Sequence, residues 1–125
     1  MRKKILIVED IPGLIHILQL EVQRLGYETI LASNGEESVE MAIAQLPNLI
    51  MMDIMMPEMD GLEAARLIRE NPKTRSIPII AVTALSSRKD KKKCLESGCD
   101  DYLCKPFTAS QLSSSITTLL EQNGT

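Results

Sequence analysis

The sequence predicts an α/β fold, a doubly wound parallel sheet of five strands with helices on both faces. Short apolar runs alternate five times with segments whose apolar residues recur every third or fourth position, which is helical spacing. No linker, repeat or low-complexity segment interrupts the alternation. Because alternating strands and helices form parallel sheets with right-handed crossovers, the loops that follow the strands should all lie at one edge of the sheet.

The first two strand and helix pairs are predicted within the first 47 residues. Strands are expected at 4–9 and 27–33, and the continuous apolar run of the first suits a strand covered on both faces. The intervening helix should end at Gly26, and its apolar stripe comprises Leu14, Ile17, Leu18, Val22 and Leu25. A turn at Asn34-Gly35 precedes the second helix, which Pro47 ends; its stripe is Val39, Ile43 and Leu46.

Three further pairs are predicted in the rest of the chain. Strands are expected at 48–53, 77–84 and 101–104. A helix with the stripe Leu62, Ala65 and Ile68 follows the first of them and is broken at Asn71-Pro72. A highly charged helix at 87–97 ends at Gly98 and offers Cys94 and Leu95 to the core. The last helix has the stripe Leu112, Ile116, Leu119 and Leu120.

The composition predicts one globular domain, residues 1–125. A net charge of -3 argues against electrostatic attraction to DNA or to an anionic membrane. Aromatic residues, at 2%, are too few for a base-stacking surface. No apolar run approaches the roughly 20 residues that span a bilayer, and the run Ile5–Val8 is too short for a signal peptide. A cytoplasmic location is therefore predicted.

The cysteines and the single histidine are not predicted to take part in chemistry. The cysteines Cys94, Cys99 and Cys104 lie five residues apart, without zinc-site spacing, so we expect reduced thiols, two or three of them in the core. The single histidine, His16, falls off the apolar stripe of the first helix and is predicted to lie on the surface.

Charged and polar residues collect where the predicted strands end. The first strand ends in Glu9-Asp10, the third in Asp53, the fourth in Thr83, and the fifth is followed by Lys105. Carboxylates brought together repel one another, and a hard divalent cation such as Mg²⁺ relieves the repulsion. A cation, a lysine and a hydroxyl around one carboxylate would suit a phosphoryl group attached to it.

This pattern resembles the receiver domain of two-component response regulators, which includes the CheY-like proteins. The resemblance covers essentially the whole chain and rests on Glu9-Asp10, "MDIMMPEMDG" around Asp53, "AVTA" with Thr83 and "DYLCKPF" with Lys105. Each stretch alone is weak, but all four in order, each at a strand end, are specific. The resemblance implies a flavodoxin-like (βα)5 fold with strand order 2-1-3-4-5.

The resemblance also implies a phosphoacceptor site. Asp53 would take a phosphoryl group from a phosphohistidine on a histidine kinase or histidine phosphotransfer protein. Asp10, Asp53 and the backbone carbonyl of Met55 would bind the cofactor Mg²⁺, with Glu9 acting through a water molecule. The apolar Met55 side chain cannot position an attacking water, so we expect a long-lived acyl phosphate.

Further roles carried by the resemblance concern phosphate binding and switching. Lys105, Thr83 and the backbone N–H of Ala84 would hold phosphate oxygens, and the Lys105-Pro106 peptide would be cis. Thr83 and Tyr102 would form a switch pair, with Tyr102 turning inward on phosphorylation. The alternative for Tyr102 is a half-buried ring with its hydroxyl in water.

The expected protein is a phosphoacceptor that catalyses its own phosphorylation and slow dephosphorylation, and not an enzyme with a separate substrate. The fourth helix, fifth strand and last helix would form its switching face for a downstream protein target. We expect a monomer or weak dimer with no DNA-binding output domain; the alternative is a receiver fragment of a hybrid histidine kinase or larger regulator. Two other classes are disfavoured. A haloacid-dehalogenase-type phosphatase would need a second acid at the position of Met55, and a flavodoxin-like FMN carrier would need a Ser/Thr/Gly-rich loop where this chain has "EDIPGL".

Overall fold

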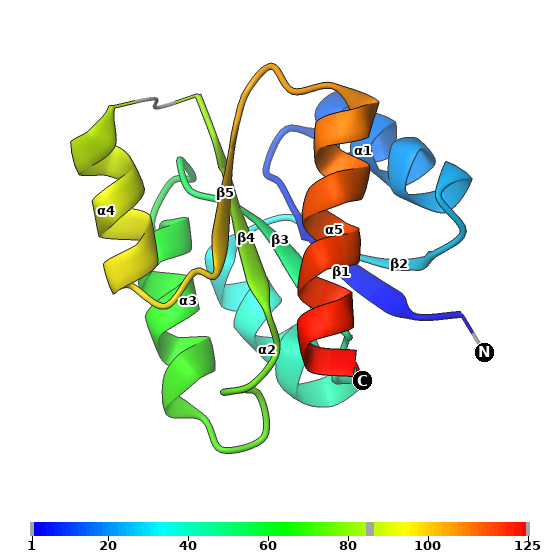
Figure 1. Ribbon diagram of the computed structural model, residues 1–125. Coiled ribbons are helices and arrows are strands. Elements are labelled where there is room, and N and C mark those ends of the chain that lie inside the picture. Colours follow the sequence, from blue (N-terminus) through cyan, green and yellow to red (C-terminus); the bar gives the residue numbers. More distant parts are fainter. Residues whose placement is uncertain (1, 85–86, 125) are drawn as a thin grey trace.

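The computed structural model describes residues 2–84 and 87–124, and in these ranges five strands alternate with five helices (Figure 1). The strands are β1 (Lys4–Val8), β2 (Glu28–Ala32), β3 (Leu49–Asp53), β4 (Ile79–Thr83) and β5 (Asp101–Cys104). The helices are α1 (Pro12–Arg24), α2 (Gly35–Gln45), α3 (Gly61–Glu70), α4 (Arg88–Glu96) and α5 (Ala109–Gly124). Neighbouring strands are parallel and their order is β2-β1-β3-β4-β5, so the predicted fold and strand order are confirmed.

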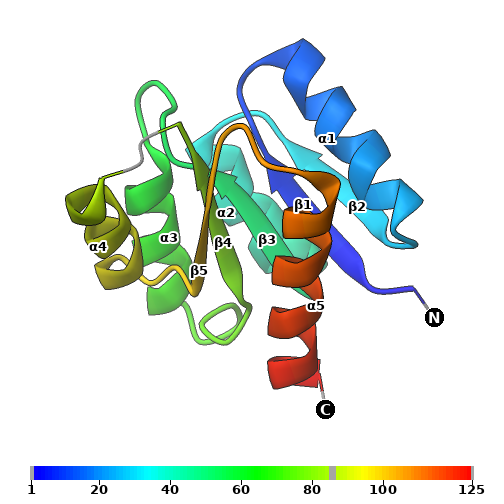
Figure 2. The same ribbon diagram turned by 45° about the horizontal axis from the view of Figure 1, so that its top comes forward.

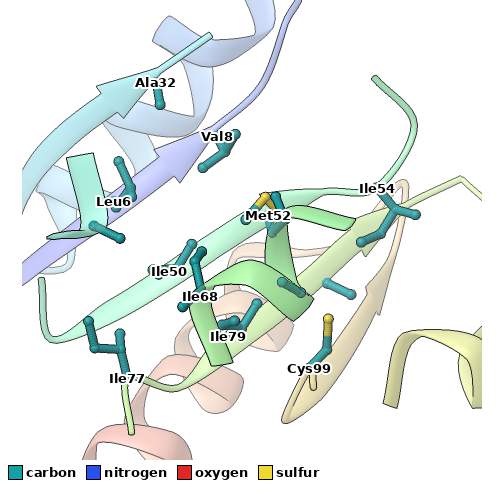
Figure 3. Packing of buried hydrophobic residues seen from close by; sticks show 14 of the residues in the cluster. Leu6, Val8, Ala32, Ile50, Met52, Ile54, Ile68, Ile77, Ile79 and Cys99 are labelled. Carbon is teal, nitrogen blue, oxygen red and sulfur yellow. The ribbon is translucent and has the colours of Figure 1, made fainter. Parts of the chain in front are cut away.

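The sheet is covered on both faces, with α1 and α5 on one side and α2, α3 and α4 on the other (Figure 2). Side chains alternate along β3, so Ile50 and Met52 face the second side while Leu49 and Met51 face the first. Figure 3 shows Ile68 of α3 packed over Ile50 and Ile79. Burying each such isoleucine contributes about 1.5–3 kcal/mol, which explains how a chain with few aromatic residues builds a core.

Helices α2, α3 and α4 begin with side-chain caps that the sequence supplies locally. The Asn34 side chain accepts a hydrogen bond from the Glu37 amide at the start of α2, and Asp60 accepts one from the Glu63 amide at the start of α3. Ser87 and Asp90 form a reciprocal capping box at α4. Each cap satisfies backbone donors that a helix leaves open at its first turn.

Several predicted apolar stripes are wrong in detail. In α1 the sheet covers Ile15, Leu18 and Val22, whereas Ile17 is 56% exposed. Spacings of three and four define two adjacent helix faces, and only packing on the sheet decides between them. Leu46 is exposed because it caps α2 in the left-handed conformation, and Leu25 lies past the end of α1 and is also exposed. The stripe of α5 is confirmed, with Leu112, Ile116, Leu119 and Leu120 all buried.

A single arginine ties α3 to two loops at the edge of the sheet opposite the strand C-termini. Arg69 Nε donates to the Gly98 carbonyl at 2.9 Å, and its Nη1 donates to the carbonyls of Arg75 and Ile77. Its Nη2 forms a salt bridge with Asp100, which also accepts the Ile79 amide. The planar guanidinium is thereby surrounded by acceptors that a lysine could not reach together.

Arg69→Ala should lower the free energy of unfolding by about 2–3 kcal/mol, because it leaves several part-buried acceptors without their donor. Urea unfolding at neutral pH measures the change. Arg66→Ala is the matched control, since Arg66 is exposed on the same helix, and it should shift stability by less than about 0.5 kcal/mol. Equal losses in the two variants would show that the Arg69 contacts are not stabilising.

Candidate functional site

The candidate site lies at the edge of the sheet where the strands end, at the top of Figure 1. Glu9 follows β1, Asp53 and Thr83 are the last residues of β3 and β4, and Lys105 follows β5. β1 and β3 are hydrogen-bonded neighbours in the sheet, as are β3 and β4, and β4 and β5. The parallel topology therefore brings residues from opposite ends of the sequence to one edge.

Three carboxylates gather there. Glu9, Asp10 and Asp53 each offer an oxygen, and these oxygens lie within 4.8 Å of one another. Glu9 is 1% and Asp53 5% exposed, whereas Asp10 is half-buried. Carboxylate oxygens at this density are the donors that hard divalent cations take, so this cluster could hold a metal ion.

Lys105 lies between two of these carboxylates. Its Nζ donates to Glu9 Oε1 at 2.9 Å and stands 3.9 Å from Asp53 Oδ1. The amide of Ile11 donates to the other Glu9 oxygen, and the amide of Met55 donates to Asp53 Oδ1 at 3.2 Å. The sequence placed Lys105 at this edge, but its close pairing with Glu9 is a finding of the structure.

The two buried carboxylates have opposite pKa shifts. The pKa of Asp53 is raised to about 7, mainly by burial and then by the hydrogen bond and charge of Glu9, while Lys105 and the Met55 amide oppose the rise. Burial also pushes the pKa of Glu9 upward, but the hydrogen bonds from Asp53 and Lys105 and the charge of Lys105 outweigh it and lower the pKa. Near neutral pH the pair therefore shares its charge unequally, with Glu9 ionised first.

Thr83 and Tyr102 lie on adjacent strands. Thr83 is buried at the end of β4, and Ala84 follows it at the surface. The Tyr102 ring packs against the same cluster as Cys94, and its hydroxyl is buried with no hydrogen-bond partner among the described residues. Burial raises the pKa of this hydroxyl. The alternative of a hydroxyl in water is therefore wrong, and the ring already points toward the protein interior.

Gly61 has a role at the site that the sequence reading missed. A Cβ at this position would lie 2.3 Å from the backbone oxygen of Asp53 and 2.8 Å from the Ile54 Cα. The Gly61 amide donates to the Ile54 carbonyl at 3.1 Å, which brings the start of α3 against the end of β3. The signal was present in the "MDG" turn, but nothing in one sequence says which backbone a glycine approaches.

Other residues fall outside the site as predicted. His16 is exposed on α1, where its ring lies 3.4 Å from the Gln19 side chain. Cys94 and Cys99 are buried and Cys104 is half-buried, all as free thiols.

The Lys105-Pro106 peptide is cis, as predicted. No helix in residues 2–84 and 87–124 is long and apolar enough to cross a membrane.

Comparison with known proteins decides the family. The sequence model of the protein family described as the response regulator receiver domain matches residues 5–117. The chain belongs to the response regulator receiver family. This receiver domain is CheY-like and is a module of two-component signalling.

Relatives of this receiver domain occur in several protein contexts. It is 37% identical over 123 residues to the alkaline phosphatase synthesis transcriptional regulatory protein PhoP of Bacillus subtilis, a match that covers 98% of the chain and 50% of PhoP. It is 35% identical over 120 residues to the polar-differentiation response regulator DivK of Brucella anthropi, covering 96% of the chain and 98% of DivK. The chain spans about half or less of the first curated relatives it matches.

A solved structure bears on the metal site. The receiver domain of sensor histidine kinase PA1611 from Pseudomonas aeruginosa is 35% identical, with a TM-score of 0.87 and 100% of both chains covered. That structure has a magnesium ion coordinated in its active site cleft. The likeness extends over the strand ends that carry the three carboxylates in this chain.

Proposed function

We propose that this receiver domain is a phosphoacceptor whose Asp53 takes a phosphoryl group from a histidine kinase or a histidine phosphotransfer protein. One observation carries the proposal: Asp53 ends a fully buried strand beside two other carboxylates, with Lys105 Nζ at 3.9 Å. A buried strand gives the nucleophile a rigid support, and the surrounding charges stabilise a transferred phosphoryl group.

The donor set fits Mg²⁺. Asp10, Asp53 and the Met55 carbonyl would bind it directly, and Glu9 would act through a water molecule. When bound, Mg²⁺ would neutralise the carboxylate cluster and the charge of the phosphoryl group. Lys105 also places a positive charge against Glu9 and Asp53.

The residues of the chain then have separate tasks in the transfer. A carboxylate oxygen of Asp53 forms a bond to phosphorus as the bond from phosphorus to the donor imidazole nitrogen breaks, giving an acyl phosphate. Lys105 would turn from Glu9 toward one phosphoryl oxygen. Thr83 and the Ala84 amide would hold the others. The protein thus promotes its own modification and later its slow hydrolysis, and does not act on a separate substrate.

Incubation with acetyl phosphate and Mg²⁺ tests the proposal. Intact-mass measurement should show a gain of one phosphoryl group, which Asp53→Asn and the removal of Mg²⁺ should each abolish. Glu58→Gln, at an exposed position in the loop after β3, is the control and should be modified like the unaltered protein. Modification of Asp53→Asn to the same extent would overturn the proposal.

Phosphorylation would be read out through the switch pair and the face made by α4, β5 and α5. Thr83 would move toward the phosphoryl group, and the Tyr102 ring would be held in its inward position. A downstream protein target would bind this face. Three contexts fit such a module: a single-domain regulator that acts by protein contact, a receiver within a hybrid histidine kinase and a receiver within a larger regulator. DivK is a relative of about the same length as the chain, the PA1611 relative comes from a sensor histidine kinase, and the PhoP relative is a longer regulator.

The acyl phosphate should be long-lived, decaying over minutes or more. Met55 lies next to Asp53 with its side chain 58% exposed, and a thioether cannot hold a water for attack on phosphorus. Met55→Asn should shorten the lifetime by at least about tenfold, because its amide can orient a water. Loss of the phosphoryl mass after acetyl phosphate is removed gives both lifetimes. A half-time of seconds in the unaltered protein would contradict this expectation.

A further inference from the structure

The exposed side of α4 carries a dense positive charge that the protein does not neutralise. Five basic residues stand against two acidic ones in nine positions, in a chain whose net charge is -3. All five are exposed, and none forms a salt bridge with any described residue; they are Arg88, Lys89, Lys91, Lys92 and Lys93. Of the two acids, Asp90 is engaged with Ser87 in the helix cap. The positive charge therefore faces outward.

An apolar residue lies within this positive surface. Arg88, Lys91, Lys92 and Leu95 follow one another at helical spacing, and we call them the α4 face. Together with Glu96 they line a shallow groove of about 410 Å³. Leu95 is 44% exposed there, whereas its neighbour Cys94 is the residue that anchors α4 in the core. The predicted core role of Leu95 is therefore wrong, and its side chain remains uncovered.

We infer that the α4 face binds an acidic helical segment of a partner protein, whose carboxylates meet Arg88, Lys91 and Lys92 and whose apolar side chain covers Leu95. The inference rests on the proposed function, since it specifies the partner of the same output face. Opposite charges steer the partner to the helix, and the apolar contact in the groove fixes its register. An apolar centre surrounded by charge is the usual anatomy of a specific protein contact.

A nucleic acid fits this surface less well than an acidic helix. A nine-residue helix is only about 14 Å long, so a phosphate backbone would run past it onto the remaining surface, where acidic side chains outnumber basic ones. Glu63 and Glu70 on α3 are exposed on the same side of the sheet as α4. A short acidic segment meets the α4 face alone and also uses Leu95, which a phosphate cannot.

A labelled synthetic helix with three glutamates around one leucine tests the inference, with fluorescence anisotropy as the readout. The unaltered protein should bind it at least about tenfold more tightly than a peptide with glutamines in place of the glutamates. Lys91→Glu combined with Lys92→Glu should weaken binding at least about tenfold, and Leu95→Ser about threefold or more. Lys73→Glu combined with Arg75→Glu, exposed positions in the loop after α3, makes the same charge change and should have little effect.

Two results would contradict binding of an acidic helix by the α4 face. Equal weakening by the two charge-reversal pairs would show that only net charge matters and would overturn the inference. Tighter binding of a duplex DNA oligonucleotide than of the acidic peptide would also overturn it. The same proteins are also treated with acetyl phosphate and Mg²⁺. If they gain a phosphoryl group but do not bind the peptide, only the α4 partner is refuted. If they bind the peptide but gain no phosphoryl group, only the phosphoacceptor role is refuted.

Discussion

Asp53→Asn is expected to raise the free energy of unfolding of the metal-free protein at pH 8 by roughly 2–4 kcal/mol. Burial and the adjacent Glu9 raise the pKa of Asp53 from 3.8 to about 7, so ionising it in the folded protein is costly. An amide at this position has no charge to bury. The Asp53 carboxylate is thus held in place at the expense of stability, as is common at functional sites.

The direction of the pH dependence follows from the raised pKa. Between about pH 4 and pH 7 the folded protein retains a proton on Asp53 that the unfolded chain has released, so stability falls as pH rises through this window. Above pH 7 the full cost is present. The two proteins should therefore differ little near pH 4 and most at pH 8.

Urea unfolding at the two pH values measures this difference, and Glu121→Gln, at an exposed position on α5, is the control with no expected change. Adding Mg²⁺ at pH 8 should stabilise the unaltered protein more than Asp53→Asn, because on the proposed function the cation would bind the ionised cluster. If the unaltered protein and Asp53→Asn were equally stable at pH 8 without metal, ionising Asp53 would not lower the free energy of unfolding, and the expectation would be wrong.

Lys105→Met is expected to slow phosphorylation by acetyl phosphate by about 100- to 1000-fold, the size of effect seen when one charge-stabilising donor is removed. The same change should lower stability at pH 8 without metal by about 1–3 kcal/mol, because Glu9 and Asp53 lose their neighbouring cation. Lys105 is partly exposed, and solvent screening keeps this loss below that of a fully buried pair.

The pH dependence separates this role from simple misfolding. Lys105 helps to lower the pKa of Glu9, so its stabilisation is present above the ordinary pKa of 4.5 and is lost as pH falls through the lowered value. The stability deficit of Lys105→Met should therefore shrink toward acid pH. Lys105→Arg keeps the charge and should recover part of the rate. A loss of rate in Lys105→Met below about threefold would contradict the assigned role.

Much of the fold was predictable from sequence because its signals are local. A continuous apolar run followed by a charge placed Asp53 at a strand end, and the alternation of strands with helices placed that end at one edge. The strand order came from the family resemblance, since crossover topology is not encoded in any short stretch. The pairing of Lys105 with Glu9 depends on which strands are neighbours, so it needed the structure.

Details that depend on packing were missed for physical reasons. Ile17 and Ile15 have similar hydrophobicity and lie two positions apart, and only the docking angle of α1 decides which one is buried. Both Cys94 and Leu95 were expected in the core, but neighbouring helix positions point in different directions, and only Cys94 is buried. The role of Arg69 was not predicted, because its acceptors lie in two separate loops that only the fold brings together.

The central claim is that Asp53 itself carries the phosphoryl group. Borohydride reduction of the protein after treatment with acetyl phosphate and Mg²⁺ tests it directly, since an acyl phosphate is reduced to an alcohol and peptide sequencing by mass spectrometry locates the change. The account predicts a reduced side chain at position 53 and an unchanged Asp10. A reduced side chain at Asp10 or Asp60, or a phosphate that resists reduction on a serine or threonine, would contradict it.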